Sequence, residues 1–251
     1  MANTVVRRAL DSGWMKASEL HLLHEESKQN PLELKRLKSI FPNGLQRGSV
    51  IEITGPKSSG RTSISLYVLA ESISRGETCA CIDLNNAFYP ASLAQAGVTL
   101  DQLSWVRCNG NTEHAMRSAD LLLHAGGFGV VLLDLCGAPP QTLNRIPLSY
   151  WFRFQRAIEH TPTILLICAE WQQARSCSRY SLAVNARKFH WKGEAPFALL
   201  DALESTAQQN KSSAAKVTSI RPESVLIQTP KLELMRFESQ FDSKLTSRGV
   251  A

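Results

Sequence analysis

Runs of consecutive apolar residues recur through the middle of the chain and predict buried strands. The run at 130–135 is apolar apart from Asp134, which is typical of a central parallel strand covered on both faces. Similar runs are found at 49–54, 79–84, 103–107 and 163–169.

Helical periodicity fills the gaps between these runs. At 61–75, Leu66, Leu69, Ala70 and Ile73 share one helix face, and further helices are predicted from Thr112 to the Gly126-Gly127 pair and at 147–159. Strands that alternate with helices predict an α/β fold with a doubly wound, mostly parallel sheet.

The two ends of the chain lack this alternation. Residues 1–39 are charged and predict a loosely docked, helical N-terminal arm outside the core, which spans 40–204. Residues 205–222 are rich in Ser, Gln, Lys and Ala, so 205–251 is interpreted as a linker and a partly disordered C-terminal tail. Two edge strands are possible within 224–237, but the same residues could equally form a docking peptide that orders on a partner.

A phosphate-loop pattern joins the first predicted strand to the first helix. Residues 55–62 read Gly-Pro-Lys-Ser-Ser-Gly-Arg-Thr, which fits Gly-x-x-x-x-Gly-[basic]-Thr except that Arg61 stands in the lysine position. Thr62 and Asp134 occupy the positions that usually hold Mg²⁺. The candidate nucleotide-binding residues are Gly55, Lys57, Ser58, Ser59, Gly60, Arg61, Thr62 and Asp134.

Arg61 leaves two interpretations of this loop open. Guanidinium is wide, planar and forked, whereas lysine reaches phosphate as a slim point charge. The loop is therefore either a weak nucleotide site or a vestigial turn retained because the fold requires it. ATP with Mg²⁺ is the cofactor that the pattern implies, and no structural metal is expected.

The run from Phe41 to about Trp191 resembles the RecA recombinase core. The residues that carry the resemblance are Asn43-Gly44-Leu45-Gln46-Arg47-Gly48, 51–62, 82–90, Ala96-Gly97-Val98, 100–103 and Val131-Leu132-Leu133-Asp134. Within that superfamily, other residues look more like ImuA, a RecA-like accessory protein of mutagenic translesion synthesis. These are Ser104-Trp105-Val106-Arg107-Cys108, 119–129, Arg145-Ile146-Pro147, Trp151-Phe152-Arg153 and, most specifically, 128–135.

The resemblance implies a RecA-like P-loop core and also exposes a second departure. RecA-type ATPases place a glutamate after the second strand to activate water, and the matching residue here is Asn85. An amide cannot take a proton, so general-base assistance worth roughly 10²–10⁴-fold is missing. Together with Arg61, this predicts little or no ATP hydrolysis. The segments that match the two DNA-contacting loops of the recombinase are also shorter in this chain, which argues against autonomous filament formation.

Basic and aromatic residues alternate between residues 145 and 192. This segment contains eight Arg or Lys and only two Glu, an excess of six that equals the +6 net charge of the chain. Basic side chains interleaved with aromatic ones are typical of a surface that binds single-stranded nucleic acid. Trp151 and Phe152, however, could simply pack the 147–159 helix on the sheet. The candidate DNA-binding residues are Trp171, Arg175, Arg179, Arg187 and Lys188.

The remaining composition points to the cytoplasm. The six cysteines lie mostly in apolar, strand-like runs without metal-ligand spacing, so they are expected to be reduced and structural. No run approaches the ~20 apolar residues of a membrane span, and no signal peptide is recognised.

Three functions remain open at this stage. The favoured one is a RecA-like accessory protein of DNA repair and SOS-induced translesion synthesis. Its implied partners are single-stranded DNA, RecA, an ImuB-type polymerase-like protein and a translesion polymerase. The alternatives are an active DNA-dependent ATPase related to RecA and a SulA-type cell-division inhibitor.

Overall fold

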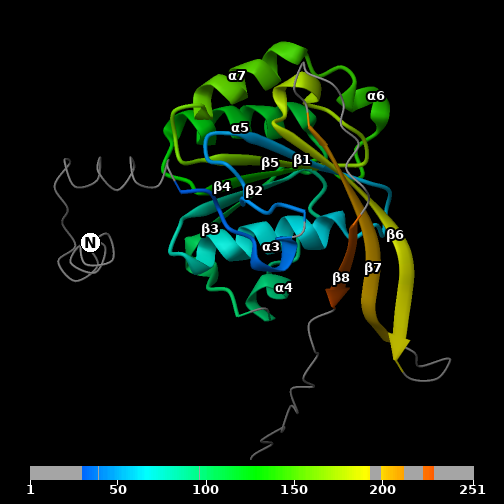
Figure 1. Cartoon of the computed structure of the whole chain (residues 1–251). Helices are drawn as coiled ribbons and strands as arrows, with labels where there is room; N and C mark the ends of the chain where they lie inside the picture. Colours follow the sequence, from blue (N-terminus) through cyan, green and yellow to red (C-terminus); the bar gives the residue numbers. More distant parts are fainter. Residues whose placement is uncertain (1–29, 39, 96, 193–198, 212–222, 229–251) are drawn as a thin grey trace, which may run out of the picture.

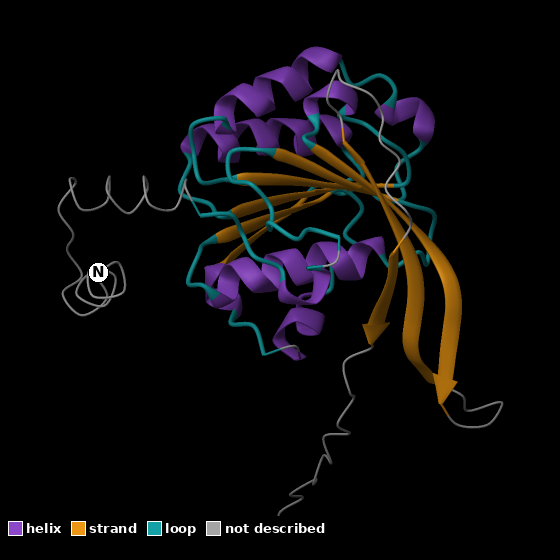
Figure 2. Cartoon of the chain, viewed as in Figure 1, coloured by secondary structure: helices purple, strands orange, loops and turns teal. Residues whose placement is uncertain are grey.

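A computed structural model describes residues 30–38, 40–95, 97–192, 199–211 and 223–228 of the chain. It has three layers, with one sheet between two layers of helices (Figures 1 and 2). The strands are β1 (Val50–Thr54), β2 (Cys79–Asp83), β3 (Leu103–Arg107), β4 (Val130–Asp134), β5 (Ile164–Ala169), β6 (Tyr180–Lys192), β7 (Leu199–Lys211) and β8 (Glu223–Gln228).

The strand order across the sheet is β3-β2-β4-β5-β1-β6-β7-β8. All pairs from β3 to β6 are parallel, and β6–β7 and β7–β8 are antiparallel. Strands β1, β2 and β4 are buried along their whole length, as expected of strands covered on both faces. The predicted mostly parallel, doubly wound sheet is confirmed.

The helices divide between the two faces of the sheet. Helices α3 (Arg61–Ser74) and α4 (Pro90–Gln95) lie on one face; α5 (Thr112–Ala125), α6 (Pro140–Leu143) and α7 (Leu148–Ile158) lie on the other (Figure 1). Short 3₁₀ helices are η1 (Lys35–Leu37), η2 (Leu100–Gln102) and η3 (Arg175–Cys177). The helices predicted at 61–75, from Thr112, and at 147–159 are therefore confirmed within a few residues.

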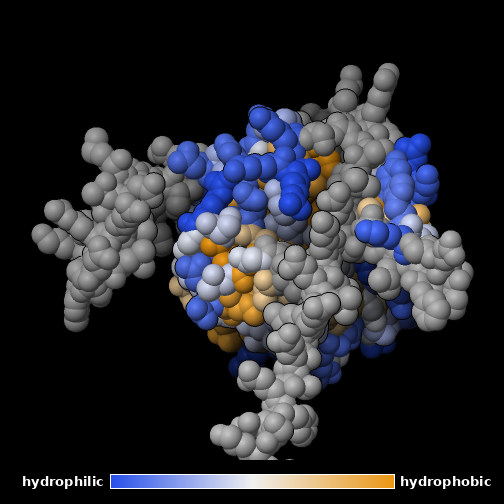
Figure 3. Space-filling model, turned by 90° about the horizontal axis from the view of Figure 1, so that it is seen from below, coloured by the Kyte–Doolittle hydropathy of each residue, from blue (hydrophilic) through white to orange (hydrophobic). Residues whose placement is uncertain are grey.

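Each face of the sheet has its own hydrophobic core. The α3 side contains Val68 and Leu69 of α3, and the α5–α7 side contains Trp151 and Phe154 of α7. Seen from below, on the α3 and α4 side, apolar side chains gather near the centre of the described surface (Figure 3). None of the described helices has the length and apolar character that a membrane crossing requires.

The N-terminal boundary of the core lies earlier than the sequence indicated. Leu32, Leu34 and Leu37 are almost fully buried in the α3-side core, so the loosely docked arm is wrong for this segment. Leu32 and Leu45 exchange two backbone hydrogen bonds of 2.8 Å, which hold the segment against the core. The rest of the predicted arm, residues 1–29 and 39, lies outside the described residues.

The predicted linker from residue 205 is wrong for residues 205–211, which form the second half of β7. Leu203, Ser205 and Ala207 are buried in strand alternation, while Glu204 and Thr206 are only partly buried. Because two of the three inward residues are Ser and Ala, the pattern reads as polar and linker-like. Of the possible edge strands, 224–228 is confirmed as part of β8, and 229–237 lies outside the described residues.

Candidate functional site: a phosphate loop closed by its own arginine

The loop between β1 and α3 has the conformation that its glycines permit. Gly60 precedes α3 with φ 93°, and Ser58 has φ 60°, so both lie in the left-handed region. A Cβ at Gly55 would collide with the carbonyl oxygen of Val184 in β6. The loop is thus a tight turn packed against the neighbouring strand, which explains its glycines without reference to a ligand.

Arg61 turns its guanidinium back into the loop instead of toward solvent. Nη1 donates to the carbonyl of Gly55, Nε donates to Sγ of Cys136 at 3.0 Å, and Nη2 forms an ion pair with Glu170 at 2.7 Å. The residue is only 6% exposed. All three nitrogens of the guanidinium therefore have acceptors within the protein.

Glu170, directly after β5, joins three segments at this point. Besides the ion pair with Arg61, its two carboxylate oxygens accept from the backbone N–H of Gly137 at 3.1 Å each. This residue was not a candidate from the sequence. Its position after a buried strand, at the carboxyl edge where the phosphate loop lies, is the signal that could have identified it.

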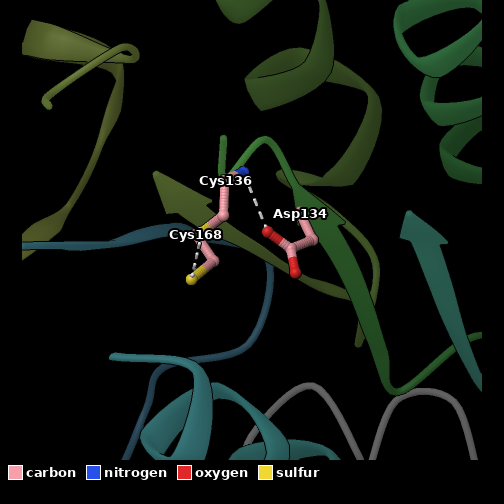
Figure 4. Close-up of side chains that lie close together, drawn as sticks. All are labelled: Asp134, Cys136 and Cys168. Carbon is pink, nitrogen blue, oxygen red and sulfur yellow. Dashed lines mark hydrogen bonds between the residues drawn. The ribbon is translucent and has the colours of Figure 1, made fainter. Parts of the chain in front are cut away.

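Thr62 and Asp134, the two expected Mg²⁺ ligands, differ in their surroundings. Thr62 is exposed on the first turn of α3, whereas Asp134 at the end of β4 is only 7% exposed. Burial raises the pKa of Asp134. One Asp134 oxygen accepts from the backbone N–H of Cys136 at 2.9 Å (Figure 4).

Two cysteines complete the surroundings of Asp134. Cys136 follows β4, Cys168 lies near the end of β5, and their sulfur atoms are 3.4 Å apart (Figure 4). Their hydrogen bond and then burial raise the pKa of the Cys136 thiol. Both cysteines follow or end neighbouring buried runs in the sequence, and parallel neighbours end at the same sheet edge, so their meeting could have been predicted.

The donor set does not fit Mg²⁺-bound ATP well. A phosphate needs free donors in the loop, but the guanidinium of Arg61 is held by Gly55, Cys136 and Glu170. Mg²⁺ prefers oxygen ligands in octahedral geometry, whereas Asp134 is flanked by two sulfur atoms. The cation of the loop is therefore bound by Gly55 within the loop and by Cys136 and Glu170 outside it.

Asn85, at the position of the expected glutamate, is also engaged within the protein. Its amide donates to the carbonyl of Cys136 at 2.6 Å and ties the turn after β2 to the turn after β4. The nearby Asp83 accepts from the N–H groups of Ala87 and Phe88, both at 3.0 Å, and from the Trp105 indole at 3.2 Å. Neither side chain is free to activate water.

Three of the DNA-binding candidates share the loop between β5 and β6. Trp171 is 54% exposed, and Arg175 and Arg179 are also exposed. The loop is anchored by Glu52 in β1, whose Oε1 accepts from the N–H groups of Gln173 and Ala174. Burial raises the Glu52 pKa to about 7.

The other two candidates lie on the distal half of β6. β1 pairs with β6 only from Tyr180 to Ala183, and β6 then extends past β1 (Figure 1). Arg187 and Lys188 are exposed there, and Arg187 forms an ion pair with Glu204 at 3.2 Å. Phe189 and Trp191, 42% and 62% exposed, lie on the same stretch.

The helix at 147–159 has a mainly structural role. Trp151 and Phe154 are buried, at 2% and 0% exposure, and Arg153 pairs with Asp120 at 2.8 Å. Phe152, expected to pack on the sheet as well, is 44% exposed.

Part of the chain is similar in sequence to RecA proteins. The RecA N-terminal domain family matches residues 36–142. Protein RecA of Rickettsia prowazekii is 39% identical over 95 residues, covering 38% of this chain and 28% of the relative. Protein RecA of Laribacter hongkongensis is 42% identical over 95 residues, covering 38% and 27%. The chain thus spans little more than a quarter of the length of these relatives.

The fold is similar to that of a recombinase of known structure. The crystal structure of the RadB recombinase aligns with a TM-score of 0.54 and 16% identity, covering 75% of this chain and 92% of that chain. The sequence matches support membership of the RecA superfamily, and the fold is similar to that of the RadB recombinase.

Proposed function

We propose that this protein is a RecA-like accessory protein of DNA repair, which acts in damage-induced translesion synthesis by binding and with little or no ATP hydrolysis. The observation that carries this proposal is the closed phosphate loop, in which the Arg61 guanidinium is held by Gly55, Cys136 and Glu170.

The absence of hydrolysis follows from two independent features. Arg61 would have to leave its ion pair with Glu170 before it could reach a phosphate, which would strand a carboxylate that is 9% exposed. Asn85 offers no base, and its amide is occupied by the Cys136 carbonyl. A single change at either residue would leave the other obstacle in place.

The loop between β5 and β6 is the surface that we assign to single-stranded DNA. Trp171 is an exposed platform on which a base can stack, and Arg175 and Arg179 are exposed cations near it in sequence. The basic and aromatic half of β6, with Lys188 and Trp191, is a second candidate contact. Together they offer the stacking and phosphate contacts of a sequence-tolerant site.

The partner proteins are inferred from the resemblance to ImuA. RecA, an ImuB-type polymerase-like protein and a translesion polymerase are the proposed partners, because such accessory proteins work with them. Pull-down of each purified partner with the full chain tests whether these proteins bind it.

Binding of labelled oligo-dT, followed by fluorescence anisotropy, tests the DNA surface. Trp171→Ala should weaken binding by roughly 5- to 150-fold, as expected for the loss of about 1–3 kcal/mol of stacking. Arg175→Ala and Arg179→Ala should each weaken binding. Each should also reduce the steepness of the plot of log binding constant against log salt concentration by about 0.7, the value for one phosphate contact on a single strand. Arg156→Ala, which removes the same charge from the exposed side of α7, is the matched control and should bind normally.

The outcomes separate this function from its alternatives. Normal binding by all three loop variants would show that the loop between β5 and β6 is not the DNA-binding surface. If the protein bound neither single-stranded DNA nor any proposed partner, the accessory function would be wrong. Cell filamentation on expression, without a mutagenesis defect on deletion, would instead favour the SulA-type inhibitor.

A further inference from the structure

We propose that Asp134, Cys136 and Cys168 form a binding site for a zinc ion at the carboxyl edge of the sheet. The site is independent of nucleotide and replaces the expectation that the protein has no structural metal. Its basis is the arrangement of three metal-ligating side chains in Figure 4.

The ligand atoms are already close to the spacing that zinc requires. The carboxylate oxygen and the two sulfur atoms all lie within 4.8 Å of one another, and the sulfurs are 3.4 Å apart. With Zn–S bonds of about 2.3 Å, tetrahedral geometry separates two thiolates by about 3.8 Å. Binding would therefore require the two sulfurs to part by only a few tenths of an ångström.

The sheet fixes two of the three ligands. Asp134 and Cys168 are direct partners in the register of the parallel strands β4 and β5. Cys136 is held in the following turn, where its N–H donates to Asp134 and its carbonyl accepts from Asn85. The ligands are thus preorganised by backbone pairing, without an ion.

The charges around the cluster favour a divalent cation. Asp134 lies beside Asp83 in the register of β4 and β2, and Glu170 offsets Arg61 through the 2.7 Å ion pair. Arg61 directs an N–H at the sulfur of Cys136, which is the contact that a metal-bound thiolate accepts from its outer shell. Binding of Zn²⁺ would displace the protons of both thiols, so it becomes tighter as the pH rises.

The donor set selects zinc over Mg²⁺ or Ca²⁺. Two sulfurs and one carboxylate suit a borderline-soft ion, whereas the hard alkaline-earth ions bind oxygen only. Three protein ligands leave the fourth tetrahedral position for water or another ligand. Cys136 is partly exposed and Cys168 is buried, so the ion has a route to the site from the Cys136 side.

Cobalt and zinc titrations of the full chain test the site. Reduced, chelator-treated protein should take up one equivalent of Co²⁺, with sulfur-to-cobalt charge transfer and the visible bands of tetrahedral cobalt, and Zn²⁺ should displace it. Cys136→Ser, Cys168→Ser and Asp134→Asn should each weaken binding by more than about 100-fold, because even outer-shell partners of a ligand cost 10–100-fold.

Cys177→Ser is the matched control, since this buried thiol lies in η3 outside the cluster and its loss should leave cobalt binding unchanged. Should Cys168→Ser fail to fold, the partly exposed Cys136 and the Asp134→Asn variant carry the test. Reduced protein that takes up no cobalt would overturn the proposal, and so would a charge-transfer band that survives in Cys136→Ser. A protein that instead joins Cys136 to Cys168 as a disulfide under mild diamide, and binds no metal when reduced, would show that the pair is a redox couple.

Discussion

The guanidinium of Arg61 and the carboxylate of Glu170 form a 2.7 Å ion pair across the mouth of the phosphate loop, and both side chains are less than 10% exposed. They come from residues 109 positions apart in the chain. The pair joins the start of α3 to the end of β5 and fills the place where a phosphate loop presents its cation. The substitution of arginine for lysine is thereby explained by a bond that lysine, with its single ammonium group, could not reproduce together with the contacts to Gly55 and Cys136.

Glu170→Gln should destabilise the protein. The change leaves the buried Arg61 without its counter-charge and turns an amide N–H₂ toward Arg61 or toward the N–H of Gly137. We expect the free energy of unfolding to fall by about 3 kcal/mol, as for other buried pairs that lose one partner. Urea denaturation measures the loss, and Glu159→Gln, at an exposed position after α7, is the control. Equal stability of the two variants would show that the pair contributes nothing.

Asn85→Glu should fail to create an ATPase and should cost stability. The new carboxylate would face the Cys136 carbonyl that now accepts a 2.6 Å hydrogen bond, so a donor becomes an acceptor. The hydrogen bond is exposed, so water can take the place of the lost donor, and we expect a loss of about 0.5–1.5 kcal/mol, the net value of one hydrogen bond. Thermal unfolding of Asn85→Glu beside the near-isosteric Asn85→Asp measures it. Unchanged unfolding temperatures in both variants would contradict the structural role of Asn85.

Glu52 should make stability decrease as the pH rises toward neutrality. Its pKa in the folded protein is about 7, against 4.5 for an ordinary glutamate, mainly because of burial. The folded state therefore holds a proton that the unfolded state has lost between these two values, and stability falls through that window by an amount on the order of 3 kcal/mol. Below about pH 4.5 both states are protonated, and above about pH 7 both are ionised, so the slope vanishes outside the window.

Glu52→Gln isolates this contribution, because its carbonyl oxygen can still accept from Gln173 and Ala174. The measurement is the free energy of unfolding against pH for both proteins. The wild-type curve should fall more steeply than the variant curve between about pH 5 and pH 7. Parallel curves would show that Glu52 titrates normally.

Ser205 should stabilise the phosphate loop from a distant strand. Its hydroxyl donates to the carbonyl of Ser59 at 2.7 Å, and the side chain is fully buried in β7. Ser205→Ala should lower the free energy of unfolding by about 1 kcal/mol, the net value of one hydrogen bond. Truncation after residue 204, which removes the rest of β7, should be far more damaging. A truncated chain that unfolds at the wild-type temperature would show that the second half of β7 and β8 are dispensable for stability.

The fold was largely predictable because its centre is apolar and periodic. The buried apolar runs around Ile51, Ile82, Leu132 and Leu166 predict central strands, and in the structure they form central strands. β7 was missed because its inward positions include Ser205, whose burial depends on a hydrogen bond that the local sequence does not reveal.

The position of the site could be predicted from the sequence, but the contacts between its side chains could not. The glycine pattern located the loop, and Arg61 and Asn85 were identified as departures from the pattern. What could not be read from the sequence was the direction of each side chain. The contacts of Arg61 with Glu170 and Cys136 join residues 109 and 75 positions apart, and only the folded sheet brings them together.

ATP turnover by the full-length protein, with Mg²⁺ and single-stranded DNA, tests the central claim most directly. We predict that wild type, Arg61→Lys and Asn85→Glu all stay at the background set by Asp134→Ala. The reason is that each of these proteins keeps at least one of the two obstacles, the loop closed by the Arg61 guanidinium or the amide of Asn85 in place of a base. DNA-stimulated turnover by the wild-type protein that disappears in Asp134→Ala would contradict the account and identify the chain as an active ATPase.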